Sequence, residues 1–164
     1  MEYKNIFGFR NEWNWKTISL FCFLAVFPNI LGLVHIDVFG FRIHFFQYLV
    51  FLAAIVYGPV GGAVSGAFGS VYTATMLHNP YIIAGNIFLG FLVGLFVRHK
   101  FHIVLAAILA YLAQMPWLWY SDIYLAGMPV AVVQKIVIAL LISDVIMALA
   151  AGYSYKPVKA LISL

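Results

Sequence analysis

Five polar side chains interrupt apolar runs of this chain at similar distances from one end of each run: Gln47, Tyr72, Asn86, Gln114 and Lys135. Each lies about four to six residues from that end, which on a helix is roughly 6–9 Å of rise. A polar group in an apolar environment is costly unless it meets a partner or a water-filled cavity. The pattern therefore predicts a solute pocket near one end of a helix bundle. An interhelical hydrogen-bond network is the alternative.

Lys135 is the member of this layer with the clearest chemical meaning. If its ammonium group faces inward, it is the only fixed positive charge of the pocket and suits a carboxylate or another electron-rich ligand group. The alternative is that the long side chain extends back to the membrane interface. An inward ammonium beside aromatic residues would favour a ring-bearing, anionic solute.

Aromatic residues crowd the same end of the predicted helices. Trp117 and Tyr120 could form flat walls around a ring-shaped solute, although tryptophan and tyrosine also collect at membrane interfaces without binding anything. His78 and Asn79 lie in the break after the third apolar run, on the same side. We include all four in the predicted substrate-binding set.

Imidazole and carboxylate groups raise the question of a metal site. The connections on this side contain His35, Asp37, His44, His78, Asn79 and Asp122. These residues are dispersed and show no ligand spacing such as H-x-x-x-H, so we predict neither a metal site nor a cofactor. Asp144 lies deep in the last apolar run. A carboxyl group there is protonated, paired with another helix, or reached by water or a partner subunit.

Motifs for covalent chemistry are missing from the sequence. There is no G-x-S-x-G, no H-E-x-x-H and no phosphate-binding glycine loop with its lysine. We therefore expect a protein that is not an enzyme. If it moves a solute, it does so passively, by coupling to an ion, or with energy from other subunits.

The elements that must position these residues are membrane-spanning helices. Hydrophobic residues make up 65% of the 164 residues and charged residues 9%, more apolar surface than a soluble domain of this size could bury. A helix of about 20 apolar residues crosses a bilayer. We predict an all-α integral membrane protein, a single domain over residues 1–164, with a retained first helix. The six predicted spans are 16–34, 43–57, 60–77, 81–98, 103–120 and 130–153.

Basic residues predict the orientation, because cytoplasmic connections of membrane proteins carry an excess of lysine and arginine. One side of the predicted bundle holds Lys4, Arg10, Lys16, Arg98, Lys100, Lys156 and Lys159, whereas the other has Arg42 only. Both termini are thus expected in the cytoplasm and the protein in the cell membrane as a multi-pass protein. The net charge of +4 then reflects topology and anionic lipid, not nucleic-acid binding.

Glycines repeat at four-residue spacing in two of the runs. Gly58, Gly62 and Gly66 lie in the third run, and Gly90 and Gly94 in the fourth. On a helix this spacing forms a smooth face against which another helix packs closely. We expect the third and fourth helices to lie deep in the bundle. A sliding surface for conformational change is the alternative.

The stretches 55–66 (IVYGPVGGAVSG), 79–86 (NPYIIAGN) and 90–95 (GFLVGL) resemble the substrate-binding S component of energy-coupling factor (ECF) vitamin transporters. Chain length, six spans and cytoplasmic termini agree with that family. The resemblance implies a high-affinity binder of a vitamin or related micronutrient, with its pocket near the external face. It also implies docking on a transmembrane coupling subunit with two ATPase subunits.

The chain departs from this family in its first helix. The A-x-x-x-A docking motif often found there is missing between Phe21 and Leu31, so the docking surface would lie elsewhere, at Ala106 and Ala110 or at Ala148 and Gly152. Two alternatives remain open. One is a non-transporting scaffold similar to the rod-shape protein MreD, and the other is a self-sufficient small transporter.

Overall fold

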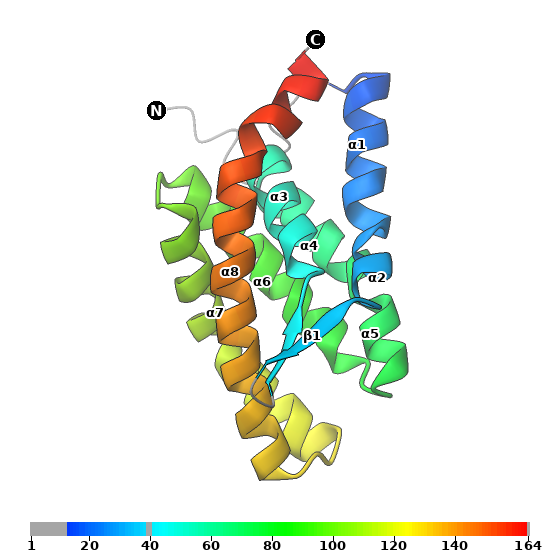
Figure 1. Ribbon diagram of the computed structural model, residues 1–164, viewed down its shortest axis with the longest axis vertical. Coiled ribbons are helices and arrows are strands. Elements are labelled where there is room, and N and C mark those ends of the chain that lie inside the picture. Colours follow the sequence, from blue (N-terminus) through cyan, green and yellow to red (C-terminus); the bar gives the residue numbers. More distant parts are fainter. Residues whose placement is uncertain (1–12, 39–40, 164) are drawn as a thin grey trace.

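The computed structural model describes residues 13–38 and 41–163. These residues form a bundle of helices with one short β-hairpin at its side (Figure 1). In chain order the elements are α1 (Trp15–Val26), α2 (Pro28–Leu31), β1 (His35–Val38), β2 (Phe41–His44), α3 (Gln47–Tyr57), α4 (Pro59–Gly69), α5 (Val71–Met76), α6 (Tyr81–Arg98), α7 (Ile103–Tyr120), the π-helix η2 (Ser121–Leu125) and α8 (Val130–Ser163). The start of α1 and the end of α8 lie at one end of the bundle. We call the opposite end, which holds η2, the distal end.

Within the described residues, three helical stretches are long and apolar enough to cross a membrane: Tyr81–Arg98, Ile103–Leu125 and Val130–Ile162. Shorter apolar helical stretches cover Trp15–Leu31 and Gln47–Tyr57. Large apolar side chains are exposed on the outer faces of several helices, among them Phe23, Leu112 and Ile138. Such a surface is compatible with a lipid environment.

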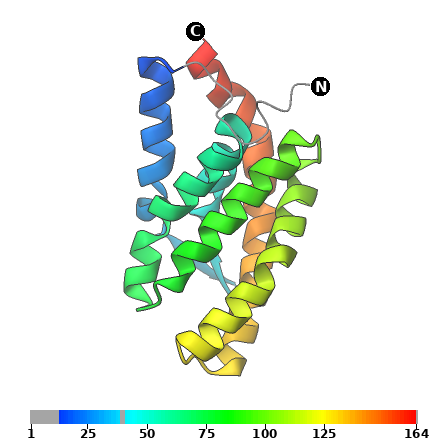
Figure 2. The same ribbon diagram turned by 180° about the vertical axis from the view of Figure 1, so that it is seen from behind.

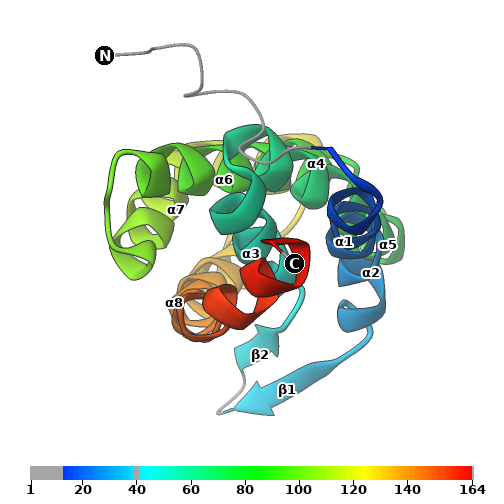
Figure 3. The same ribbon diagram turned by 90° about the horizontal axis from the view of Figure 1, so that it is seen from above.

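The predicted second span, 43–57, begins too early. Ile43 belongs to β2, and the helix starts at Gln47. Residues 35–38 and 41–44 instead pair antiparallel, from His35 opposite His44 to Val38 opposite Phe41, because this pairing satisfies backbone groups that a loop would leave open. The hairpin lies along the side of the bundle between α2 and α8 (Figure 3), and the backbone N–H of His44 donates to Ser143 Oγ at 3.2 Å. The fold is therefore helical with one hairpin, not purely α.

Two other predicted boundaries also need correction. The third span, 60–77, is divided at Ser70 into α4 and α5. The Ser70 hydroxyl donates to the carbonyl of Gly66 at 2.6 Å, a type of bond that often bends a helix. The last helix continues ten residues beyond Tyr153 to Ser163. The Ser154 hydroxyl is hydrogen-bonded to Tyr48 at 2.8 Å, and Val158 packs against the buried cluster under α1.

The turn between α3 and α4 depends on a glycine. Gly58 has φ +83° and ψ −162°, a conformation that is essentially restricted to glycine. Its position is also crowded, because a Cβ atom there would overlap the guanidinium group of Arg98. That group donates to the carbonyl of Tyr57 at 3.3 Å and so holds the turn against the end of α6.

We expect Gly58→Ala to destabilise the protein much more than Gly127→Ala. Gly127 also has a positive φ, +67°, but nothing lies within 4 Å of a Cβ atom there. Gly127→Ala should therefore cost only the backbone strain of about 1–2 kcal/mol, whereas Gly58→Ala forces a backbone conformation essentially restricted to glycine and also displaces the guanidinium group of Arg98 from the turn. Melting temperatures of the two variants in detergent measure the difference. Equal melting temperatures would contradict the role assigned to Arg98.

The glycine faces of α4 and α6 pack against each other, and the two helices lie side by side in Figure 2. Close packing of each face was predicted, but its partner was not. A Cβ atom at Gly62 would overlap the carbonyl oxygen of Gly90, and one at Gly90 would overlap that of Gly62. Nearer the two ends, Gly66 faces the backbone of Asn86 and Gly94 faces that of Pro59. This close contact brings the first half of α6, with Asn86, against the centre of the bundle.

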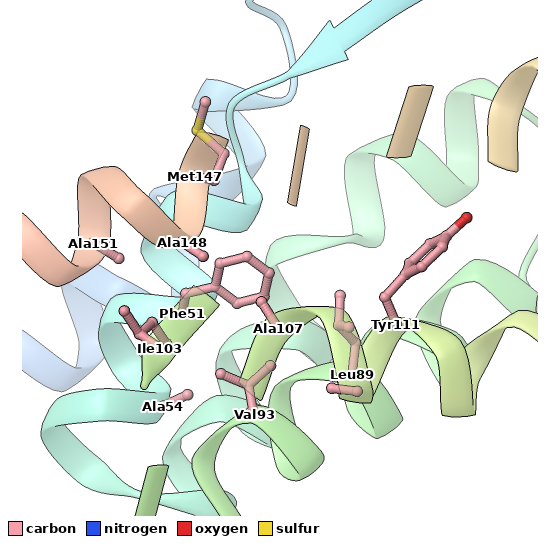
Figure 4. Packing of buried hydrophobic residues seen from close by; sticks show 11 residues of the cluster. Phe51, Ala54, Leu89, Val93, Ile103, Ala107, Tyr111, Met147, Ala148 and Ala151 are labelled. Carbon is pink, nitrogen blue, oxygen red and sulfur yellow. The ribbon is translucent and has the colours of Figure 1, made fainter. Parts of the chain in front are cut away.

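The main apolar core lies between α3, α6, α7 and α8. Phe51, Val93, Ala107 and Ala148 lie at its centre and are fully buried (Figure 4). The suggested docking surfaces are therefore wrong in three of their four positions. Ala106, Ala110 and Ala148 are 0% exposed and cannot face a partner subunit.

Candidate functional site

A cavity of about 100 Å³ lies within the distal half of the bundle, directly beyond the apolar core. Its walls come from β2, the start of α3, α5, the first half of α6, the last half of α7, η2 and the first half of α8. Tyr111 belongs to both the core and the cavity wall. The apolar core thus closes the cavity on its inner side.

Four of the nine predicted site residues line this cavity. They are Gln47, Asn86, Gln114 and Trp117, and they come from three helices that are far apart in sequence. Gln47 and Gln114 are 1% and 6% exposed. Three of the five residues of the predicted polar layer therefore lie around the same cavity.

The other five predicted residues do not line the cavity. Tyr120 is 52% exposed, and His78 and Lys135 are also exposed. The backbone N–H of Tyr72 donates to Asn29 Oδ1 at 2.8 Å beside α2. Asn79 is buried and does not line the cavity itself, but it donates a hydrogen bond to Asp122, which does.

The expectation of an inward ammonium group at Lys135 is wrong. The face of α8 that lines the cavity contains Ile136, Leu140 and Asp144 at four-residue spacing. Lys135 precedes this face by one residue, which rotates it about 100° around the helix. No lysine or arginine is among the described residues that line the cavity.

Asp144 is the site residue that the polar-layer argument missed. It lies fourteen residues after the start of α8, about 21 Å along the helix axis. The predicted polar layer, only four to six residues deep, therefore did not include it. The cavity extends inward to this depth, and Asp144 is 1% exposed in its wall. Its spacing of four and eight residues from Leu140 and Ile136 was the available signal.

Asp122 is a second carboxylate in the wall, and its position depends on η2. The π-helix follows α7, which contains Pro116, and π-turns are frequent at functional sites. The side-chain amide of Asn79 donates to Asp122 Oδ1 at 2.7 Å, with both residues buried. This bond joins the α5–α6 connection to η2 across the distal end.

The side-chain donors around the cavity are mostly satisfied within the protein. The Trp117 indole N–H donates to the carbonyl of Tyr81 at 3.2 Å, and the Tyr111 hydroxyl donates to that of Val137 at 2.6 Å. The Asn86 amide donates to the carbonyl of Ile82 at 3.0 Å. These groups shape the wall and have little donor capacity left for a ligand.

Three buried acceptors in the same wall have no hydrogen-bond partner among the described residues: Gln47 Oε1, Gln114 Oε1 and Asp144 Oδ1. Buried polar atoms are almost always paired, so each exception asks for an explanation. Because all three border one cavity, molecules within that cavity, either solvent or a solute, are the simplest explanation for them.

No cluster of three or more histidine, cysteine, aspartate or glutamate side chains able to hold a metal ion occurs in the described part of the chain. His44 and the two aspartates border the cavity but do not form such a group. The arrangement therefore suits binding through hydrogen bonds and charge.

Comparison with known proteins gives no match among family models, curated proteins or solved structures.

Proposed function

We propose that the protein is a membrane-embedded solute-binding subunit that receives a small molecule in the distal cavity. The observation that carries this proposal is the set of three unpartnered buried acceptors around one cavity. A bundle held together by polar contacts alone would use those groups to bind one another. Leaving them open costs about 1–3 kcal/mol each, a cost that a bound solute would offset.

The finer proposal is an S component of an ECF-type transporter for a vitamin-like micronutrient. The resemblance of residues 55–66 and 79–95 supports it, together with the position of the cavity. With six spans and cytoplasmic termini, the distal end faces outside, where an uptake protein meets its substrate. The sequence has no nucleotide-binding motif, so the energy would come from a coupling subunit with two ATPase subunits.

The size of the cavity narrows the substrate. A space of about 100 Å³ is small compared with typical ligand pockets of about 300–1,000 Å³. In this conformation it suits a solute with a single ring and excludes a large multi-ring cofactor.

Mass spectrometry of small molecules that copurify with the protein tests the proposal. A matched variant is Gly85→Val, because a Cβ atom at Gly85 points at Gln114 Nε2 (2.8 Å) and Trp117 Cδ1 (3.4 Å) in the cavity wall. The nearest atom is the end of a flexible side chain, so the variant should fold. We expect the wild type to carry a small molecule that Gly85→Val lacks, with melting temperatures within about 4 °C of each other.

Gly152→Val is the control, because it crowds Ile103 away from the cavity. It should retain the small molecule. If no molecule is enriched on the wild type over Gly85→Val, the binding function is wrong and a scaffold role is favoured. If the purified chain alone accumulates the molecule in liposomes against a gradient, the dependence on ATPase subunits is wrong.

A further inference from the structure

The cavity wall is unbalanced in its hydrogen-bonding groups. The donors of Trp117, Tyr111 and Asn86 are used within the protein, whereas three buried acceptors are open. A side-chain amide can turn to present either its oxygen or its NH₂ group, so Gln47 and Gln114 adapt to a ligand. The ionised carboxylate of Asp144 can only accept hydrogen bonds, and it decides which ligand chemistry fits.

The charges around the cavity have the same sign. Asp122 and Asp144 are both in the wall and at most 5% exposed, and no lysine or arginine is among the described lining residues. Asp122 already accepts a hydrogen bond from Asn79 at 2.7 Å, whereas Asp144 Oδ1 is open. A buried carboxyl group without a partner either takes up a proton or pairs with a cation. A cationic ligand beside Asp144 would therefore stabilise its carboxylate form.

Aromatic side chains complete the wall. Phe46, Tyr81, Tyr111 and Trp117 border the cavity, and aromatic faces attract cations, most strongly where water is excluded. These rings also provide apolar contact for the carbon atoms of a ligand. An anion would meet two carboxylates and ring faces here, with no fixed positive charge to balance it.

We propose that the ligand of the distal cavity is a compact organic cation, such as an amine or amidine, whose N–H groups bind Asp144 and the two glutamine side chains. This inference rests on the proposed solute-binding function and assigns its substrate class. It reverses the anionic preference that an inward Lys135 would have given. A metal ion is disfavoured, because the described residues offer no cluster of three ligating side chains.

Three probes of matched shape separate the charge types: benzylamine, benzyl alcohol and benzoate. The full-length protein in detergent is titrated with each at neutral pH, and the melting temperature gives the apparent affinity, since a ligand that binds only the folded state raises it. We expect benzylamine to stabilise the wild type and the other two to have little effect. In Asp144→Asn, the affinity for benzylamine should fall by about tenfold or more.

Asp37→Asn is the matched control, because Asp37 is an exposed residue of β1 outside the cavity wall, and it should leave benzylamine binding unchanged. A sodium chloride titration covers the simplest competing cation. If sodium alone gives the Asp144-dependent stabilisation, or if benzoate or benzyl alcohol stabilises the wild type as strongly as benzylamine, the organic-cation inference is overturned. The same holds if Asp144→Asn binds benzylamine normally, or if none of the probes binds.

If Asp144→Asn does not fold, the charge of the small molecule that copurifies with the wild type provides a second measurement. A basic nitrogen in that molecule supports the inference, and an anionic or neutral molecule overturns it while the binding function stands. If no molecule copurifies at all, the proposed function fails first and the substrate class fails with it. The two proposals are therefore tested separately.

Discussion

Gly62→Ala is expected to lower the melting temperature of the protein in detergent by about 10 °C, which corresponds to roughly 3 kcal/mol. The new methyl group would overlap the carbonyl oxygen of Gly90 and lie 2.8 Å from the Cβ of Ala54. Neither neighbour can move away, because one is the backbone of α6 and the other is fixed on α3. The helices must separate, and the close α4–α6 contact is lost.

Phe68→Leu is the control for this variant, because Phe68 is on the same helix and 58% exposed. It should change the melting temperature by no more than about 2 °C. Gly90→Ala provides a sharper test, since its methyl group would overlap the carbonyl of Gly62 in turn. Once one substitution has separated the helices, the second costs less, so the double variant should lose less stability than the sum of both. Additive losses would contradict a shared contact.

The close packing of the glycine faces of α4 and α6 could be predicted from the sequence because it depends on spacing alone, whereas the contact of the two faces with each other could not. Glycines at four-residue intervals lie on one face of any helix, whatever surrounds it. The layer of Gln47, Asn86 and Gln114 could be predicted for the same reason, since depth along a helix follows from residue number. Each of these predictions needs only the positions of residues along a single helix.

The direction in which a side chain points from its helix could not be predicted in this way. Lys135 and Ile136 are neighbours in sequence, yet one is exposed and the other lines the cavity. The choice between them depends on how α8 rotates against α3 and α7, which is a property of packing. Asp144 was missed because the depth of the cavity is set by the core around Phe51 and Tyr111, which no single helix reveals.

The hairpin shows a different limit of sequence interpretation. Residues 35–44 are too few for a recognisable strand pattern, and isolated two-stranded hairpins are marginal in water. Here the neighbouring helices decide the outcome, because β2 docks on α8 through the hydrogen bond from His44 to Ser143. The hairpin thus belongs to the site, since His44, which pairs with His35 at the open end of the hairpin, borders the cavity.

The bond between Asn79 and Asp122 is the second contact whose loss should have a large effect. Asn79→Ala removes the donor 2.7 Å from Asp122 Oδ1 and leaves a carboxylate that is 5% exposed without this partner. It also removes the acceptor for the backbone N–H of Tyr81, 3.1 Å away at the start of α6. We expect a loss of about 2–3 kcal/mol in the free energy of unfolding and weaker binding in the cavity, whose wall includes Asp122.

A double variant that exchanges the side chains of Asn79 and Asp122 tests whether the hydrogen bond itself matters, or only the residue type at each position. Asn79→Asp alone places a second carboxyl group opposite Asp122 and should be more harmful than Asn79→Ala, because like charges repel at this distance. Adding Asp122→Asn restores one amide and one carboxylate, now in reversed positions. The carboxylate at position 79 still accepts from the N–H of Tyr81, so the double variant should recover more than half of the lost stability. If it melts no higher than Asn79→Asp, the pair does not hold the distal end together, and the wall around Asp122 must be positioned by α7 and η2 alone.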